Sequence, residues 1–276
     1  MLIRTGIVFQ AFKYAIYALL AINTVAFFVE NFASVGHLYP DGLKPGDIII
    51  AYADSIDTAA WLVLLIMLEL ETYVIPDEKI KGWVDRTISI VSFVCWALIL
   101  YSLYGYIGSL DEAYGYAAYA GADPCGLVDT GATLARGLDD YVDLDAENCR
   151  TLAGGALVHP AHGAFISTEN LGVMKRLAWT DVLNASVWVL IVVILELEIY
   201  LKSSKLIGTK FFLAYKSFKA FLYVILLVNV IYWWALDAPL DAWDAFVWLV
   251  AFFFIEMNML AWQEETAKKR AAGEIS

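Results

Sequence analysis

Two nearly identical phrases, LELETY at 68–73 and LELEIY at 195–200, place paired glutamates inside long apolar runs. A carboxylate in the hydrocarbon core of a membrane costs about 2–3 kcal/mol or more unless it is paired or hydrated. Such residues bind ions, relay protons or form ion pairs that hold helices together. The residue types alone leave both interpretations open, an ion or proton site and a purely structural pairing.

Both phrases belong to a longer repeat. The segments 54–73, 181–200 and 241–260 align without gaps: an Asp, then Asp or Asn three residues later, Trp four after that and Glu eight after the Trp. The candidate ion-binding or relay residues are Glu69, Glu196, Glu256, Glu71, Glu198 and Asn258, the last of which replaces the second glutamate in the third copy. The acidic residues expected at the outer mouth are Asp54, Asp57, Asp181, Asp241 and Asp244.

Helical geometry separates these repeated residues. At 100° per residue, Asp54, Asp57 and Trp61 form one stripe, whereas Glu69 and Glu71 lie about 160° apart and cannot share one partner. The aspartates suit either the cap of a helix start or an outer mouth, and the repeated Trp residues suit anchors at the membrane interface. The first glutamate lies about 15 residues, roughly 22 Å, below the outer end of its helix.

Basic residues in the odd-numbered spans offer partners for these carboxylates. Lys13 and Lys219 begin the same spacing of Lys, Tyr and Asn, and Arg86 takes the corresponding place in the middle hairpin. We expect Lys13, Arg86 and Lys219 to pair with or tune the glutamate of their own hairpin.

The composition is that of an integral membrane protein. The chain has 276 residues, 61% of them hydrophobic, and a mean hydropathy of +0.65, whereas soluble domains are about 45–50% apolar. About 20 helical residues cross a hydrocarbon core of roughly 30 Å. We predict an all-α fold with six transmembrane helices at 7–30, 56–75, 87–108, 181–201, 217–236 and 243–262.

These helices are expected to form three tandem hairpins in the same membrane orientation, at 1–84, 85–210 and 211–276, with an extracytoplasmic insertion at 109–178. Lys and Arg cluster at the start, between the second and third and the fourth and fifth spans, and at the end. The positive-inside rule then predicts cytoplasmic termini, and we expect a bacterial inner membrane. Because no span has Pro and those at 56–75, 181–201, 217–236 and 243–262 lack Gly, close packing through small residues is expected to be scarce.

Two of the three cysteines, Cys125 and Cys149, fall in the insertion, and Cys95 lies in a span. An oxidising exterior favours a Cys125–Cys149 disulfide over two free thiols.

All three histidines lie outside the spans, which excludes haem held by two histidines within the membrane. His37, His159 and His162 are candidates for an outer metal site, since HPAH offers two ligands three residues apart. Incidental surface histidines are the alternative. Phosphate-binding loops, nucleophile elbows and HExxH are missing, so no covalent enzyme is indicated and no cofactor is assigned.

Two functions follow from these features. The first is the handling of protons or small cations through the repeated carboxylates, as a channel or transport component. The alternative is an accessory or scaffold subunit of a larger membrane complex, in which the charge pairs only lock the hairpins. The expected partners are the lipid bilayer and other membrane subunits or further copies of the chain, and the net charge of −12 argues against nucleic acid.

Overall fold

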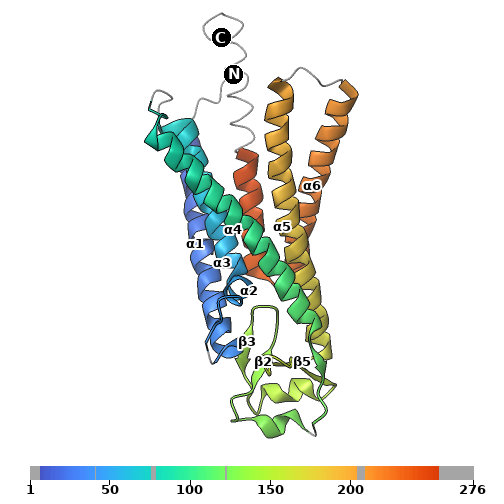
Figure 1. Cartoon of the computed structure of the whole chain (residues 1–276). Helices are drawn as coiled ribbons and strands as arrows, with labels where there is room; N and C mark the ends of the chain where they lie inside the picture. Colours follow the sequence, from blue (N-terminus) through green and yellow to red (C-terminus); the bar gives the residue numbers. More distant parts are fainter. Residues whose placement is uncertain (1–6, 41, 76–78, 122, 204–208, 255–276) are drawn as a thin grey trace, which may run out of the picture. The chain divides into compact units, whose positions relative to one another are not determined.

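The structure is a computed structural model that describes residues 7–40, 42–75, 79–121, 123–203 and 209–254. It is mostly helical (Figure 1). The helices are α1 (Ile7–Leu38), α2 (Ile48–Ala51), α3 (Ala53–Glu69) with the π-helical turn η1 (Leu70–Val74), α4 (Trp83–Tyr114), α5 (Thr168–Ser203) and α6 (Thr209–Ala235), and residues 239–254 are also helical.

Four helical segments are long and apolar enough to cross a membrane: Gln10–Leu38, Trp83–Tyr114, Thr168–Leu195 and Tyr215–Ala235. Between 22% and 44% of their most apolar windows is buried, so most of that apolar surface faces outward, as it does in a protein surrounded by lipid. The expected span at 56–75 overlaps α3 plus η1, and the described part of the expected span at 243–262, up to residue 254, is helical. That these two segments cross the membrane remains a prediction.

Helix α5 begins thirteen residues before the expected span at 181, because a polar cap starts it early. The Ser167 hydroxyl accepts a hydrogen bond from the Asn170 backbone N–H at 3.1 Å, which satisfies a free donor of the first turn. Asp181 therefore lies inside α5, and a capping role for it is wrong.

The insertion is not helical throughout, and in this part the all-α prediction is wrong. Its five strands form one sheet of order β1-β4-β5-β2-β3, in which only the β2–β5 pair is parallel. No strand exceeds three residues, which is too short for a visible alternation of apolar and polar residues. The strands are β1 (Ala117–Ala118), β2 (Thr133–Ala135), β3 (Tyr141–Asp143), β4 (Ala156–Val158) and β5 (Phe165–Ser167).

The predicted disulfide is confirmed: Cys125 and Cys149 join the short 3₁₀ helices η2 (Pro124–Leu127) and η3 (Asn148–Leu152). Buried residues of β2 and β5 pack against the ends of α4 and α5, with Ile166 against Ala113 and Met174. The sheet therefore covers the carboxyl end of α4 (Figure 1) and holds the loop between β4 and β5 next to it.

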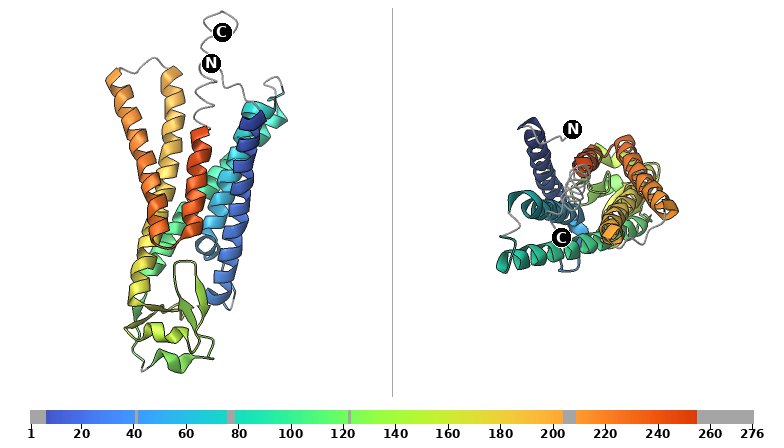
Figure 2. Two further views of the ribbon diagram at one scale, coloured as in Figure 1. Left: turned by 180° about the vertical axis from the view of Figure 1, so that it is seen from behind. Right: turned by 90° about the horizontal axis from the view of Figure 1, so that it is seen from above.

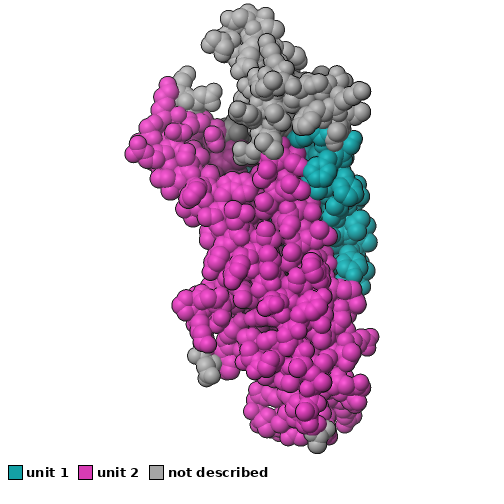
Figure 3. Space-filling model, turned by 45° about the vertical axis from the view of Figure 1, so that its right-hand side comes forward, with its two compact units in different colours: residues 1–23, 209–276 teal, residues 24–208 magenta. Residues whose placement is uncertain are grey.

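The chain forms two compact units, residues 1–23 with 209–276 and residues 24–208 (Figure 3). In the first, the Asn23 amide donates a hydrogen bond of 2.8 Å to a carboxylate oxygen of Asp244, and both residues are buried. In the second, α4 packs against α2, α3 and α5 (Figure 2).

Glycines bring α4 close to its neighbours, so the expectation of little small-residue packing is wrong for this helix. A Cβ on Gly105 would lie 2.5 Å from the carbonyl oxygen of Ile49, and one on Gly108 would lie 2.7 Å from the Ile50 side chain. Neither position has room for a larger residue. This close approach sets which side chains of α3 and α4 meet.

Candidate functional site

One side of α4 carries polar residues through an otherwise apolar helix. Ser102, Tyr106, Ser109 and Glu112 follow one another at intervals of three or four residues, which places them along one side over about 15 Å. Ser102 is fully buried and Tyr106 is nearly so, whereas Glu112 is partly exposed at the end. We call these four residues the α4 polar face.

Three predicted mouth residues gather around the Tyr106 phenol. Its hydroxyl lies 3.5 Å from a carboxylate oxygen of Asp57 and also bonds with Asp54. Asp181 of α5 is the third carboxylate whose charge acts on it. The tyrosine ring is held between Ala53 and Ala185, whose small side chains let the three helices approach. Carboxylates far apart in sequence thus share one buried hydroxyl.

A second set of hydrogen bonds ties these carboxylates to α1. Ser55 donates to the Asn31 side-chain oxygen at 2.5 Å, and the Asn31 amide donates to Asp54 at 3.4 Å. Helix α3 starts at Tyr52 with no side-chain cap, so Asp54 serves this network instead of capping the helix. Buried polar groups need such partners, since an unpaired one costs about 1–3 kcal/mol.

Two buried atoms next to this cluster lack a partner in the described part of the chain. They are the Ser102 hydroxyl oxygen, one turn from Tyr106, and the side-chain oxygen of Asn184, one turn from Asp181. Buried polar atoms without a protein partner commonly bond to internal water. Water at these positions would extend the row of hydrogen-bonding groups from the Tyr106 cluster further between α4 and α5.

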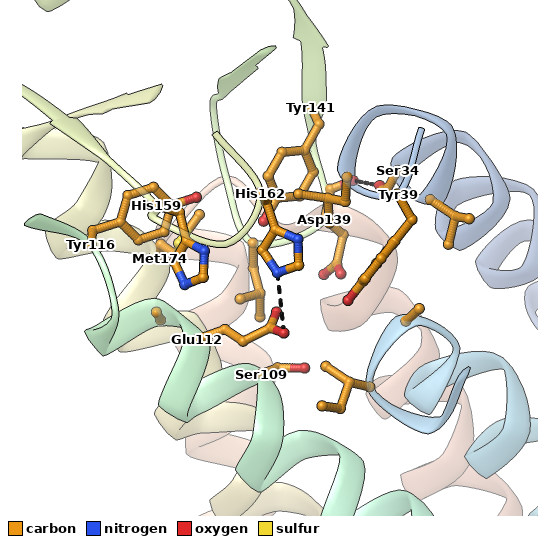
Figure 4. Close-up of a pocket in the computed structure, with 16 residues that line it drawn as sticks. Ser34, Tyr39, Ser109, Glu112, Tyr116, Asp139, Tyr141, His159, His162 and Met174 are labelled. Carbon is orange, nitrogen blue, oxygen red and sulfur yellow. Dashed lines mark hydrogen bonds and ion pairs between the residues drawn. The ribbon is translucent and has the colours of Figure 1, made fainter. Parts of the chain in front are cut away.

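At the Glu112 end of the α4 polar face lies a cavity of about 40 Å³ (Figure 4). A water molecule occupies about 30 Å³ in the liquid, so the space suits one or two waters. The lining comes from the end of α1, from α2, from the carboxyl end of α4, from the β2–β3 hairpin and from the loop between β4 and β5. Its polar residues are Ser34, Tyr39, Ser109, Glu112, Tyr116, Asp139, Tyr141, His159 and His162.

Two histidines stack in this cavity, with ring centroids 4.8 Å apart and planes at 17°. His162 Nε2 lies 3.4 Å from Glu112 Oε1, the contact drawn dashed in Figure 4. His159 is only 7% exposed, and its Nδ1 has no hydrogen-bond partner among the described residues. Edge-to-face contacts with Tyr116 and Tyr39, at 5.1 and 5.0 Å, hold the two rings in place.

The two imidazoles have opposite proton affinities. Burial, and then the neighbouring His162, lowers the pKa of His159 below its ordinary 6.5. The hydrogen bond to Glu112 raises the pKa of His162 above the same value. Burial also raises the pKa of Tyr116 to about 12, so this phenol stays neutral. Near neutral pH, His159 is therefore the neutral member of the pair and His162 the one that more readily carries charge.

These shifts predict a stability maximum between the two histidine pKa values. A lowered folded-state pKa means that the unfolded chain binds the His159 proton more tightly, so stability falls as pH drops below 6.5. The raised pKa of His162 contributes stability below 6.5 that is lost as pH rises through its folded value. Thermal unfolding against pH should show both slopes. His159→Gln should flatten the acid slope and His162→Gln the alkaline one; unchanged slopes in both variants would contradict the assignment.

The third histidine lies apart from this pair. His37 Nδ1 is 3.4 Å from a carboxylate oxygen of Asp143. Within the described ranges, no group of three or more His, Cys, Asp or Glu residues could hold a metal ion. The structure thus joins two of the three candidate metal ligands and places the third elsewhere.

The repeated glutamates are described only in part. Glu69 is buried at the end of α3 and Glu71 is exposed in η1. The side chains of Glu196 and Glu198, and the residues Glu256 and Asn258, lie outside the described part. That the three repeated glutamates lie close to one another therefore remains a prediction.

The other repeated residues are better described. Trp61, Trp188 and Trp248 are all buried at 7–8% exposure, so their expected role as interfacial anchors is wrong. Of the expected charge partners, Lys13 is buried, Lys219 is partly buried and Arg86 is exposed. Asp241 and Asp244 belong to the first unit, where Asp244 bonds to Asn23.

Several residues of the site were missed from sequence: Asn31, Ser102, Tyr106, Ser109 and Glu112. A signal for four of them was present, because SLYGYIGSLDE at 102–112 has polar residues at helical spacing that begin inside the predicted span 87–108 and continue past its end. The contacts of Tyr106 with α3 and α5 had no comparable signal.

No protein-family model, characterised protein or solved structure matches this chain significantly.

Proposed function

We propose that this membrane protein handles protons or small cations through the polar residues buried between α1, α3, α4 and α5. The observation that carries the proposal is the buried Tyr106 hydroxyl among Asp54, Asp57 and Asp181. A purely structural hydrogen bond needs one acceptor, whereas three neighbouring carboxylates repel one another. Ionisable groups placed at such cost in apolar helices mark ion or proton pathways.

The order of the groups along α4 supports a path instead of an isolated site. Glu112 faces the outer cavity, Ser109 follows one turn deeper, and Tyr106 and Ser102 come next. Each step along this face is three or four residues, about 4.5–6 Å, a distance that one hydroxyl or one water molecule can bridge. Negative charge at the outer end would concentrate cations there.

The finer topology is part of the same proposal. Six spans in three parallel hairpins, with cytoplasmic termini in a bacterial inner membrane, would place the insertion outside and Glu69 toward the cytoplasm. Glu69, Glu196 and Glu256 would then continue the path inward, with Lys13, Arg86 and Lys219 tuning their charge.

Ion flux in proteoliposomes tests the proposal. Asp57→Asn keeps the size of the side chain but removes its charge, and we expect flux to fall at least about tenfold, the factor that about 1.4 kcal/mol of lost stabilisation produces. Asp111→Asn is the matched control, since Asp111 is an exposed carboxylate next to Glu112 on α4. Tyr106→Phe should resemble Asp57→Asn.

The opposite result would favour the accessory subunit. Wild-type protein that moves no proton, Na⁺ or K⁺, together with an Asp57→Asn variant that merely unfolds at lower temperature, would make the partly buried carboxylates around Tyr106 structural. Purification of the intact complex from native membranes would then identify what the protein binds.

A further inference from the structure

The size and the residues of the cavity between His159, His162 and Glu112 suit the proton better than a metal cation. Its volume of about 40 Å³ accommodates one or two waters. A metal cation that keeps several waters of hydration needs a multiple of that space, and the described residues offer no set of three His, Cys, Asp or Glu ligands to replace those waters. A proton that moves through water and imidazole needs neither a larger volume nor a set of three ligands.

His159, which lines this cavity, supplies a buried ring nitrogen without a partner in the described chain. The residue is only 7% exposed, yet its Nδ1 finds no partner within the described chain. The other edge of the ring lies against the end of α4, because a Cβ on Gly115 would lie 2.6 Å from Nε2. A neutral imidazole carries one hydrogen and one lone pair, so a cavity water can bond to this nitrogen in either tautomer.

His162 continues the connection inward. Its ring lies against that of His159, and its Nε2 lies 3.4 Å from Glu112, the outermost residue of the α4 polar face. Figure 4 shows both imidazoles and the Glu112 carboxylate lining the same space, with Tyr39 and Asp139 across from them. The polar atoms therefore form a sequence from the buried histidine to the start of the path between the helices.

We propose that His159, His162 and Glu112 form the proton-accepting entrance of this path, and that the transported ion is the proton. This inference rests on the proposed function, which names protons or small cations, and selects the proton among these ions. It also assigns the two clustered histidines to proton exchange instead of metal binding.

The proton balance is simple. A hydronium in the cavity gives its proton to Nδ1 of neutral His159, leaving water and an imidazolium. This imidazolium returns the proton to a cavity water, and the hydronium so formed protonates neutral His162 at Nε2. The imidazolium of His162 gives its Nε2 proton to the Glu112 carboxylate, leaving neutral imidazole and a carboxylic acid. The acid then releases the proton to water beside Ser109, and the carboxylate is restored. No bond other than those to hydrogen changes, and no oxidant or reductant is required.

The charges around the pair favour this exchange. Glu112 stabilises the imidazolium of His162, while the burial that lowers the pKa of His159 lets that residue release a proton quickly. Stacking at 4.8 Å makes simultaneous charging of both rings costly, so they would charge in turn. Besides the two histidines, the titratable groups that line the cavity or act electrostatically on the pair are Glu112, Tyr116, Tyr39, Asp47, Asp139 and Tyr141.

Proteoliposomes with imposed gradients of H⁺, Na⁺ or K⁺ test the proposal in the full-length protein. We expect flux in the H⁺ gradient only. His159→Gln and His162→Gln should each lower it at least fivefold and weaken its dependence on pH between 5 and 8, the range in which histidine titrates. The matched control is His37→Gln, which should leave flux unchanged because His37 lies against Asp143. Thermal unfolding of each variant checks that it is folded.

The outcomes separate the two proposals. Flux of Na⁺ or K⁺ without H⁺ flux would overturn this inference and leave the proposed function standing. If both histidine variants are as stable as the wild type and show the same proton flux, the proposed entrance would be overturned and the proposed function would stand. Absence of any flux would overturn the proposed function itself. If both glutamine variants unfold, His159→Asn and Glu112→Gln replace them in the test. Unchanged proton flux in these two variants, with both folded, would overturn the proposal that His159, His162 and Glu112 form the entrance.

Discussion

A Gly105→Leu variant is expected to yield little folded protein in detergent. A Cβ at this position would lie 2.5 Å from the carbonyl oxygen of Ile49 and 3.1 Å from the Ala53 side chain. The first of these atoms is backbone, so it can move only if α2 shifts away from α4. Overpacking of a tight interior costs about 1–3 kcal/mol even for small additions, and leucine adds three more carbons beyond Cβ.

The measurement is the fraction of monodisperse protein and its unfolding temperature, with Gly36→Leu as the matched control. Gly36 is also a helical glycine near the end of a membrane-length helix, and a Cβ there meets no atom within 4 Å. Both substitutions raise helix propensity, so the difference between them isolates the close approach of α4. Equal stability of the two variants would show that α2 can move freely.

The same contact has a functional consequence. Gly105 precedes Tyr106, so any outward shift of α4 withdraws the phenol from Asp54 and Asp57. A milder variant, Gly105→Ala, is expected to retain the fold at about 1–3 kcal/mol lower stability. Its ion flux should fall more than its stability alone explains, which Gly36→Ala would not reproduce.

The second large effect is expected in the other unit, at the buried pair of Asn23 and Asp244. The amide donates to the carboxylate at 2.8 Å, and the two side chains are 3% and 9% exposed. Asn23→Leu removes this donor and leaves the buried charge with fewer partners, at a cost of about 3 kcal/mol. The free energy of unfolding in detergent, measured with denaturant, gives the result directly.

A double-mutant cycle distinguishes loss of this bond from general disturbance. Asn23→Leu with Asp244→Leu removes both polar groups, and we expect the double variant to be more stable than the sum of the two single changes predicts. Asp237→Asn, at an exposed carboxylate before the same helix, is the control and should change stability by less than about 0.5 kcal/mol. Strict additivity in the cycle would mean that the two side chains are not coupled.

Local features of the sequence were enough to predict a helical membrane protein. Apolar runs longer than a bilayer is thick predict membrane helices wherever they occur, since every backbone polar group must then be bonded within its own segment. The disulfide followed from the placement of three cysteines, only two of which lie in the insertion. The acidic repeat also identified Asp54, Asp57 and Asp181 as residues that belong together, although as a mouth and not around a shared hydroxyl.

Only the tertiary structure decided which polar groups meet. Helical periodicity states which side of α4 carries Tyr106, but the approach of α4 to α2 and to the start of α3 depends on Gly105, which lies against the Ile49 backbone and the Ala53 side chain. The strands of the insertion are too short to leave a pattern, so the position of the loop that carries His159 and His162 had no signal in the chain. Side-chain periodicity is a property of one element, whereas a site is built where several elements come together, and that depends on packing between residues far apart in sequence.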